Sequence, residues 1–206
     1  MITILYTVFS ITIAALLFSK EIHQSNKLFY SIAIVVAIFT TSHIPNVVNT
    51  GYVPIAFFIV VLFSGLLEKN SIRKRLFTVR AELAIIGSIL MFPHAYGYLE
   101  YYLGDLQGST LTISFVLGLS AYVLMIPLTI TSFQKIRRKM GYKTWKALHK
   151  TAYIFFFLVG LHVILIANEN QLLYTILFTF YFSMRFIAMV QVKHAKQKKL
   201  NPVHTT

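Results

Sequence analysis

The sequence predicts an all-α membrane protein, a polytopic bundle of about seven transmembrane helices. Composition gives the first indication, since 57% of the 206 residues are hydrophobic and only 12% are charged. Soluble domains typically contain roughly 25% charged residues, and the mean hydropathy of +0.70 also favours a membrane protein. The second indication is the arrangement, because long apolar runs alternate with short polar or basic connections. One crossing needs about 20 residues, so seven crossings use nearly the whole chain.

We expect one transmembrane helix in each apolar run. The runs lie at about residues 2–19, 28–44, 52–67, 81–103, 112–132, 150–167 and 171–190. The first and third are near the lower length limit for a span. The first run has neither a basic segment before it nor a clear cleavage site of small residues after it. We therefore interpret it as a retained anchor and not as a signal peptide.

The basic residues predict the orientation. All 19 lysines and arginines fall after the first, third and fifth runs or around the end of the last one, and the other connections contain none. By the positive-inside rule, the N-terminus lies outside and the C-terminus in the cytoplasm of a cell that we expect to be bacterial. The net charge of +13 thus belongs to cytoplasmic loops and not to a nucleic-acid-binding surface. We expect the basic segment 193–206 to be a disordered cytoplasmic tail.

Two histidines lie inside the predicted membrane at matching depth. His94 follows Arg80 by 14 residues, and His162 follows His149 by 13 residues, which places both about 20 Å from the inner edge. Intramembrane ionisable residues mark functional sites by default, so we interpret the pair as axial ligands of one haem iron. Ordinary interhelical hydrogen bonds are the alternative for each histidine. The chain has no cysteine, so covalent haem attachment is excluded.

Small residues near the two histidines are expected to allow a porphyrin or a neighbouring helix to approach closely. They are Gly87, Gly97 and Gly160. Pro93 is expected to kink the helix just before His94.

The remaining polar residues receive simpler interpretations. We expect Glu82 to be a local charge partner near Arg80, and His43 to be a polar group at a helix end. His23, His194 and His204 are expected to be solvated in cytoplasmic segments.

Four features resemble the ferric reductase-like transmembrane domain. They are the segment RAELAIIG at 80–87, His94, the inner-loop run SFQKIRRKMGYKTWKALHK at 132–150, and His162. Within this family, the chain is similar to the haem-binding membrane subunit of the bacterial methionine sulfoxide reductase system. On this basis we divide the chain into three parts. They are an N-terminal extension of one to two helices (1–51), a haem-binding transmembrane domain (52–192) and the basic cytoplasmic tail (193–206).

The resemblance implies a bundle that holds b-type haem between histidines of two helices and passes electrons across the membrane. It implies that His94 and His162 are outer-tier ligands and that His149 is an inner-tier ligand. In two-haem members such as the NADPH oxidases, a histidine stands at the position that Arg80 occupies in this chain. The Arg80 side chain cannot bind iron. Arg80 then either pairs with a haem propionate or a flavin phosphate, or is a positive-inside anchor. His149 has three interpretations: ligand of a second haem, contact of a quinone or flavin, or interfacial polar residue.

We therefore expect a transmembrane b-type cytochrome, the electron-transfer subunit of an oxidoreductase. The chain has no G-x-G-x-x-G dinucleotide fingerprint, so a cytoplasmic flavin reductase or a membrane quinol is the expected donor. The expected outer acceptor is a partner reductase or ferric iron. Expected cofactors are one haem b or two, with FMN or quinone as further candidates. The alternatives are a small proton or metal-ion transporter or channel that uses the intramembrane histidines, and a non-catalytic assembly subunit.

Overall fold

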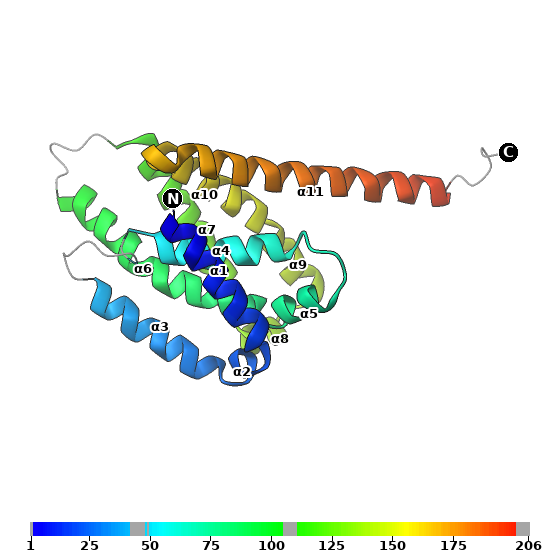
Figure 1. Ribbon diagram of the computed structural model, residues 1–206, viewed down its shortest axis with the longest axis horizontal. Helices are drawn as coiled ribbons and strands as arrows, with labels where there is room; N and C mark the ends of the chain where they lie inside the picture. Colours follow the sequence, from blue (N-terminus) through cyan, green and yellow to red (C-terminus); the bar gives the residue numbers. More distant parts are fainter. Residues whose placement is uncertain (1, 42–47, 49, 105–110, 201–206) are drawn as a thin grey trace.

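Helices make up the regular structure of the part of the chain that can be described. The computed structural model describes residues 2–41, 48, 50–104 and 111–200, and all regular elements within these ranges are helical. In chain order they are α1 (Ile2–Leu17), α2 (Ser19–Gln24), α3 (Asn26–Thr40), α4 (Tyr52–Ser64), α5 (Ser71–Thr78), α6 (Arg80–Gly104), α7 (Ile113–Ile130), α8 (Gln134–Lys139), α9 (Tyr142–Lys150), α10 (Ala152–Ile166), the 3₁₀ turn η1 (Asn168–Asn170) and α11 (Gln171–Leu200). The predicted all-α class is confirmed for these residues (Figure 1).

The apolar runs are helical, but their lengths differ. Three helical stretches are long and apolar enough to cross a membrane: Ile113–Ile130, Tyr142–Ile166 and Gln171–Gln191. α5 and α6 meet at 49° and give a fourth if they form one bent span. The remaining apolar helices are shorter: Thr3–Leu17, Asn26–Thr40 and Tyr52–Ser64. The described residues thus contain three to four candidate spans, and the predicted count of seven and the orientation remain predictions.

α4 is short and lies inside the protein. Nine of its 13 residues are buried, as expected for an apolar stretch of about 10–14 residues that forms a core helix. α4 packs against α1 and α6. Its Phe58 also has edge-to-face contacts with Phe155 and Phe156 of α10, with ring centroids 5.3 and 6.4 Å apart. This helix therefore connects the N-terminal half of the bundle with the C-terminal half.

α7, α10 and α11 form the C-terminal half. α10 packs against both neighbours, while large apolar side chains on α7 and α11 point outward. Ile113, Leu172 and Phe186 are 71%, 73% and 64% exposed. Exposed apolar faces of this extent mark contact with a membrane or a partner. Their hydropathy and length place these helices in a lipid bilayer.

α11 continues as a helix to Leu200, and Figure 1 shows it extending beyond the rest of the bundle. The expectation of a disordered tail from residue 193 is therefore wrong for residues 193–200. This stretch contains no proline or glycine, and four of its eight residues are lysine, which is a good helix former. Residues 201–206 lie outside the described part of the chain.

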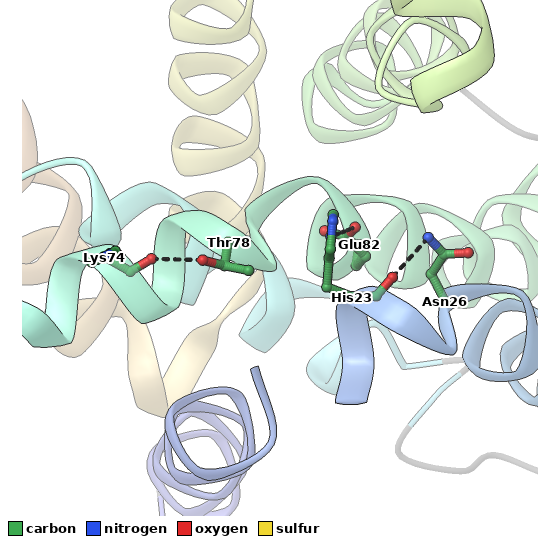
Figure 2. A network of polar contacts seen from close by, with 5 residues as sticks. All are labelled: His23, Asn26, Lys74, Thr78 and Glu82. Carbon is green, nitrogen blue, oxygen red and sulfur yellow. Dashed lines mark hydrogen bonds and ion pairs between the residues drawn. The ribbon is translucent and has the colours of Figure 1, made fainter. Parts of the chain in front are cut away.

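Glu82 pairs with His23 and not with Arg80. His23 Nδ1 donates to Glu82 Oε1 at 2.7 Å, and Figure 2 shows the two side chains facing each other between α2 and α6. Two expectations are therefore wrong: that Glu82 pairs with Arg80, and that His23 is solvated without a protein partner. Arg80 and Glu82 are two positions apart on one helix, so their side chains do not face each other. Glu82 is only 5% exposed, and its Oε2 has no hydrogen-bond partner among the described residues.

We expect His23→Ala to destabilise the protein, because the buried Glu82 carboxylate loses its donor. The His23 side chain is 46% exposed, so we expect a cost near the lower end of the usual range, about 1 kcal/mol. For a chain of this size, that lowers the melting temperature by about 2–4 °C. Thermal denaturation in detergent measures the change. Gln24→Ala, at an exposed position of the same helix, is the control, and equal melting temperatures for the two variants would contradict the assignment.

Candidate functional site

The structure brings together His94 of α6 and His162 of α10. Their ring centroids lie 6.2 Å apart, and the ring planes are inclined at 79°. The proximity predicted from their equal depth is therefore confirmed. Both rings line one cavity of about 510 Å³, a size within the range of about 300–1,000 Å³ typical of cofactor sites.

The backbone of α7 holds His162. Nδ1 of His162 donates to the carbonyl oxygen of Ser114 at 2.7 Å. Because Nδ1 carries the proton in this bond, Nε2 keeps the lone pair that can bind a metal. Histidines that bind metals usually donate their other nitrogen to a carbonyl or a carboxylate in this way. The bond thus holds the His162 ring on α7 in the tautomer that leaves Nε2 unprotonated.

His94 lies in the interior of α6, directly after Pro93. Tyr98, one turn later on the same helix, packs on the imidazole with ring centroids 4.9 Å apart. Gly51, which precedes α4, approaches the same imidazole, since a Cβ at this glycine would lie 3.2 Å from His94 Nδ1. The His94 ring is therefore in contact with its own helix and with the start of α4.

The wall of this cavity is mostly apolar, with several tyrosines. Its apolar members include Met91, Met125, Phe155, Val159 and Val163. Its tyrosines are Tyr52, Tyr96, Tyr98, Tyr102, Tyr122 and Tyr174. An apolar cavity with a few convergent polar groups is typical of cofactor sites.

The distance between the two histidine rings is compatible with both of them binding one haem iron. An imidazole nitrogen binds a transition metal at about 2.0 Å, and the ring centre lies about 1 Å further away, so two axial imidazoles have centres about 6 Å apart. The observed separation of 6.2 Å agrees. A porphyrin supplies the other nitrogens itself, so the protein needs no third ligand. Within the described residues, no group of three or more His, Cys, Asp or Glu side chains is placed to hold a metal ion.

A second cavity, of about 520 Å³, is lined by four arginines. They are Arg73, Arg80, Arg137 and Arg185. Arg185 donates to the Tyr153 hydroxyl, but its Nε is buried with no hydrogen-bond partner among the described residues. Much of the remaining wall is apolar, for example Phe58 and Leu128. Guanidinium groups pair well with phosphate and carboxylate oxygens, so this cavity suits a partly apolar ligand that carries such a group.

His149 lies in the wall of the second cavity together with Arg80. Its Nε2 is 3.0 Å from Thr131 Oγ1, and the Trp145 ring packs on the imidazole at a centroid distance of 4.3 Å. The Trp145 indole also donates to the Thr131 carbonyl at 3.2 Å. His149 is the one histidine among the described residues that line this cavity. All three interpretations of His149 from the sequence therefore stay open.

The two cavities share part of their walls. Met125 of α7 and Phe155 of α10 line both of them, and these side chains are only 5% and 4% exposed. Groups bound in the two cavities would therefore be neighbours, with a thin layer of protein between them.

Two of the three glycines that were expected to allow close approach of a porphyrin or a neighbouring helix do so towards a helix. Gly87 and Gly160 pack against phenylalanine side chains of neighbouring helices, and Gly97 has no neighbour within 4 Å of a Cβ position. Among the glycines that the structure describes, Gly51 and Gly118 are the two that contact these imidazoles. Neither glycine could be predicted from the sequence, because both lie outside the histidine helices and no spacing rule links them to the histidines.

Three further histidines cannot be assigned to a site. His43 and His204 lie outside the described residues, as does the side chain of His194. Their interpretations as a helix-end residue and as solvated residues stay predictions.

Residues 47–161 match the family described as "Ferric reductase like transmembrane component". The match covers 115 of the 206 residues and includes His94 and His149. The chain belongs to the ferric reductase-like transmembrane family. The family and the three to four candidate spans agree on a membrane protein, and the family points to a role in transmembrane electron transfer.

Three proteins are similar in sequence to this chain. An uncharacterized protein of Treponema pallidum is 33% identical over 161 residues, which cover 70% of this chain and 43% of that protein. The magnetosome protein MamZ of Magnetospirillum gryphiswaldense is 44% identical over 80 residues, covering 37% of this chain and 12% of MamZ. MamZ of Paramagnetospirillum magneticum is 41% identical over 85 residues, covering 40% and 13%. No solved structure matches the chain.

The chain therefore spans less than half the length of these relatives. None of their names refers to the methionine sulfoxide reductase system, so that closer resemblance remains a prediction. The proposed domain boundaries at residues 52 and 192 also remain predictions.

Proposed function

We propose that this chain is a transmembrane b-type cytochrome in which His94 and His162 hold one haem b. The single observation that carries the proposal is the pair of imidazoles with centres 6.2 Å apart in an apolar cavity. The bond from His162 Nδ1 to Ser114 supports it, because it leaves Nε2 available for the metal. When bound, haem supplies a one-electron Fe(III)/Fe(II) couple. With His94 and His162 both bound to the iron, no position would remain open for oxygen or substrate, which favours electron transfer over catalysis at the metal.

The arginine-lined cavity is the proposed position of a second group on the donor side. Four guanidinium groups and apolar walls suit a haem with its propionates, an FMN with its phosphate, or a quinone held in the apolar part. Arg80 would pair with an anionic group of this ligand, and His149 would contact it from the wall. The cavity also borders the histidine cavity through Met125 and Phe155. This adjacency supports two cofactor positions in series.

The proposed setting is the bacterial plasma membrane, with seven spans, the N-terminus outside and the arginine cavity toward the cytoplasm. A cytoplasmic flavin reductase or a membrane quinol is the proposed donor. The family description favours ferric iron as the outer acceptor. A partner reductase, as in the methionine sulfoxide reductase system, is the other proposed acceptor.

Replacing either histidine is expected to remove the haem. We expect the wild-type protein, purified in detergent from haem-replete cells, to show a low-spin, six-coordinate b-type spectrum. His94→Ala and His162→Ala should each lower haem affinity by more than tenfold. Even the replacement of a residue that only hydrogen-bonds to a metal ligand lowers metal affinity by about 10–100-fold. Visible spectra and haem content per chain measure this.

His194→Ala, a histidine on the part of α11 beyond the candidate span, is the control and should keep the full spectrum. A colourless wild-type protein would refute the cytochrome and favour the transporter or the assembly subunit. Retention of the six-coordinate spectrum in both cavity variants would refute the assignment of the ligands.

Replacing arginines of the second cavity is expected to release the second group while the first haem stays. A hydrogen bond to a charged group contributes about 1.5–3 kcal/mol, so Arg80→Gln and Arg185→Gln should each weaken binding by about tenfold or more. Haem content per chain, together with extraction of flavin and quinone, measures occupancy.

Arg75→Gln is the matched control, because Arg75 donates to the Leu16 carbonyl at 2.9 Å and does not line the cavity. One haem per wild-type chain, no flavin or quinone, and still rapid reduction from the cytoplasmic side would contradict the second group.

A further inference from the structure

The geometry points to Gly51 and Gly118 as positioning residues for the two imidazoles. Each glycine places bare backbone against one of the histidine rings, and so fixes the ring's height and plane in the cavity. This inference rests on the proposed function, in which the two rings bind one haem iron. It adds two residues from outside the histidine helices to the site.

Gly118 supports His162 on the surface of α7. A Cβ at Gly118 would lie 2.8 Å from His162 Cε1 and 2.9 Å from its Nδ1. Such distances are too short for a carbon contact, so any side chain would push the ring away. Ser114, whose carbonyl accepts the hydrogen bond from the same ring, is four residues earlier. Residues four apart lie on one face of a helix, so α7 presents a carbonyl and a bare glycine side by side to one imidazole.

Gly51 has the corresponding role for His94. A Cβ at Gly51 would lie 3.2 Å from His94 Nδ1 and 3.3 Å from its Cε1. Gly51 also has φ of 85°, a left-handed conformation that glycine adopts without strain. Its carbonyl accepts from the Ile55 N–H at 3.1 Å at the start of α4. One glycine therefore sets the first turn of the core helix and the position of the ring.

Gly160 and Gly97 differ from Gly51 and Gly118, because a Cβ at either position would not meet a histidine ring. At Gly160, a Cβ would lie 2.9 Å from Phe178 Cδ1 and would not meet a histidine. At Gly97, three residues after His94, a Cβ would have no neighbour within 4 Å. Gly160 is two residues before His162, so it offers an equally tight contact near the same histidine. These two glycines provide the controls for the test.

The test compares Gly118→Ala and Gly51→Ala with Gly97→Ala and Gly160→Ala in the full-length protein. We expect Gly118→Ala and Gly51→Ala to lower haem affinity by about tenfold or more. This is the size of effect seen when residues that orient a metal ligand are replaced. In the haem that remains, the electron paramagnetic resonance g values of the low-spin ferric iron should shift, because the angle between the imidazoles changes. Gly97→Ala should match the wild type, and Gly160→Ala should lower the melting temperature while keeping wild-type g values.

A stability measurement covers the case in which Gly118→Ala yields too little haem protein for spectra. If the methyl group acts through the His162 ring, its effect on the melting temperature should disappear in the His162→Ala background, as a double-mutant cycle requires for two coupled residues. An undiminished effect in that background would overturn the inference.

Two spectroscopic results would also overturn it: wild-type haem content and g values in Gly118→Ala and Gly51→Ala, or the same g shift in Gly160→Ala. In each of these results the wild-type protein still binds haem, so the proposed function stands. A colourless wild-type protein would instead remove both proposals together.

Discussion

The hydrogen bond from His162 to the Ser114 carbonyl is the interaction on which the site depends. An imidazole inside an apolar bundle must have its polar nitrogens satisfied, and this bond satisfies Nδ1 and leaves the lone pair on Nε2. His94 reaches the same cavity from α6, where Tyr98 and Gly51 contact its ring. The separation of 6.2 Å between the two rings therefore results from four helices, α4, α6, α7 and α10, and not from the histidine pair alone.

The two neighbouring cavities differ in charge. The histidine cavity is apolar and rich in tyrosine, whereas the neighbouring cavity contains four arginines. Met125 and Phe155 separate the two, so an anionic ligand held by the arginines would be close to a group held by the histidines. The N-terminal helices α1 to α3 precede the region that matches the family. They are tied to α6 by the bond between His23 and Glu82.

The sequence was sufficient for the features that follow from periodic patterns. Hydropathy located the apolar helices, and the rise per residue of a helix predicted that His94 and His162 would meet. Helix lengths were less predictable, because α4 is apolar through burial in the protein and not through contact with lipid. The pairing of Glu82 with His23 and the contacts of Gly51 and Gly118 join distant segments. Such contacts depend on tertiary packing, which a single sequence does not encode in any local pattern.

The most direct test of the central claim is low-temperature electron paramagnetic resonance of the purified ferric protein. The ring planes of His94 and His162 are inclined at 79°. If both histidines held a haem iron at this inclination, two iron d orbitals would be almost equal in energy, and a highly anisotropic low-spin signal is expected. A high-spin haem signal, or no haem signal, would contradict the claim that these two histidines bind one haem iron.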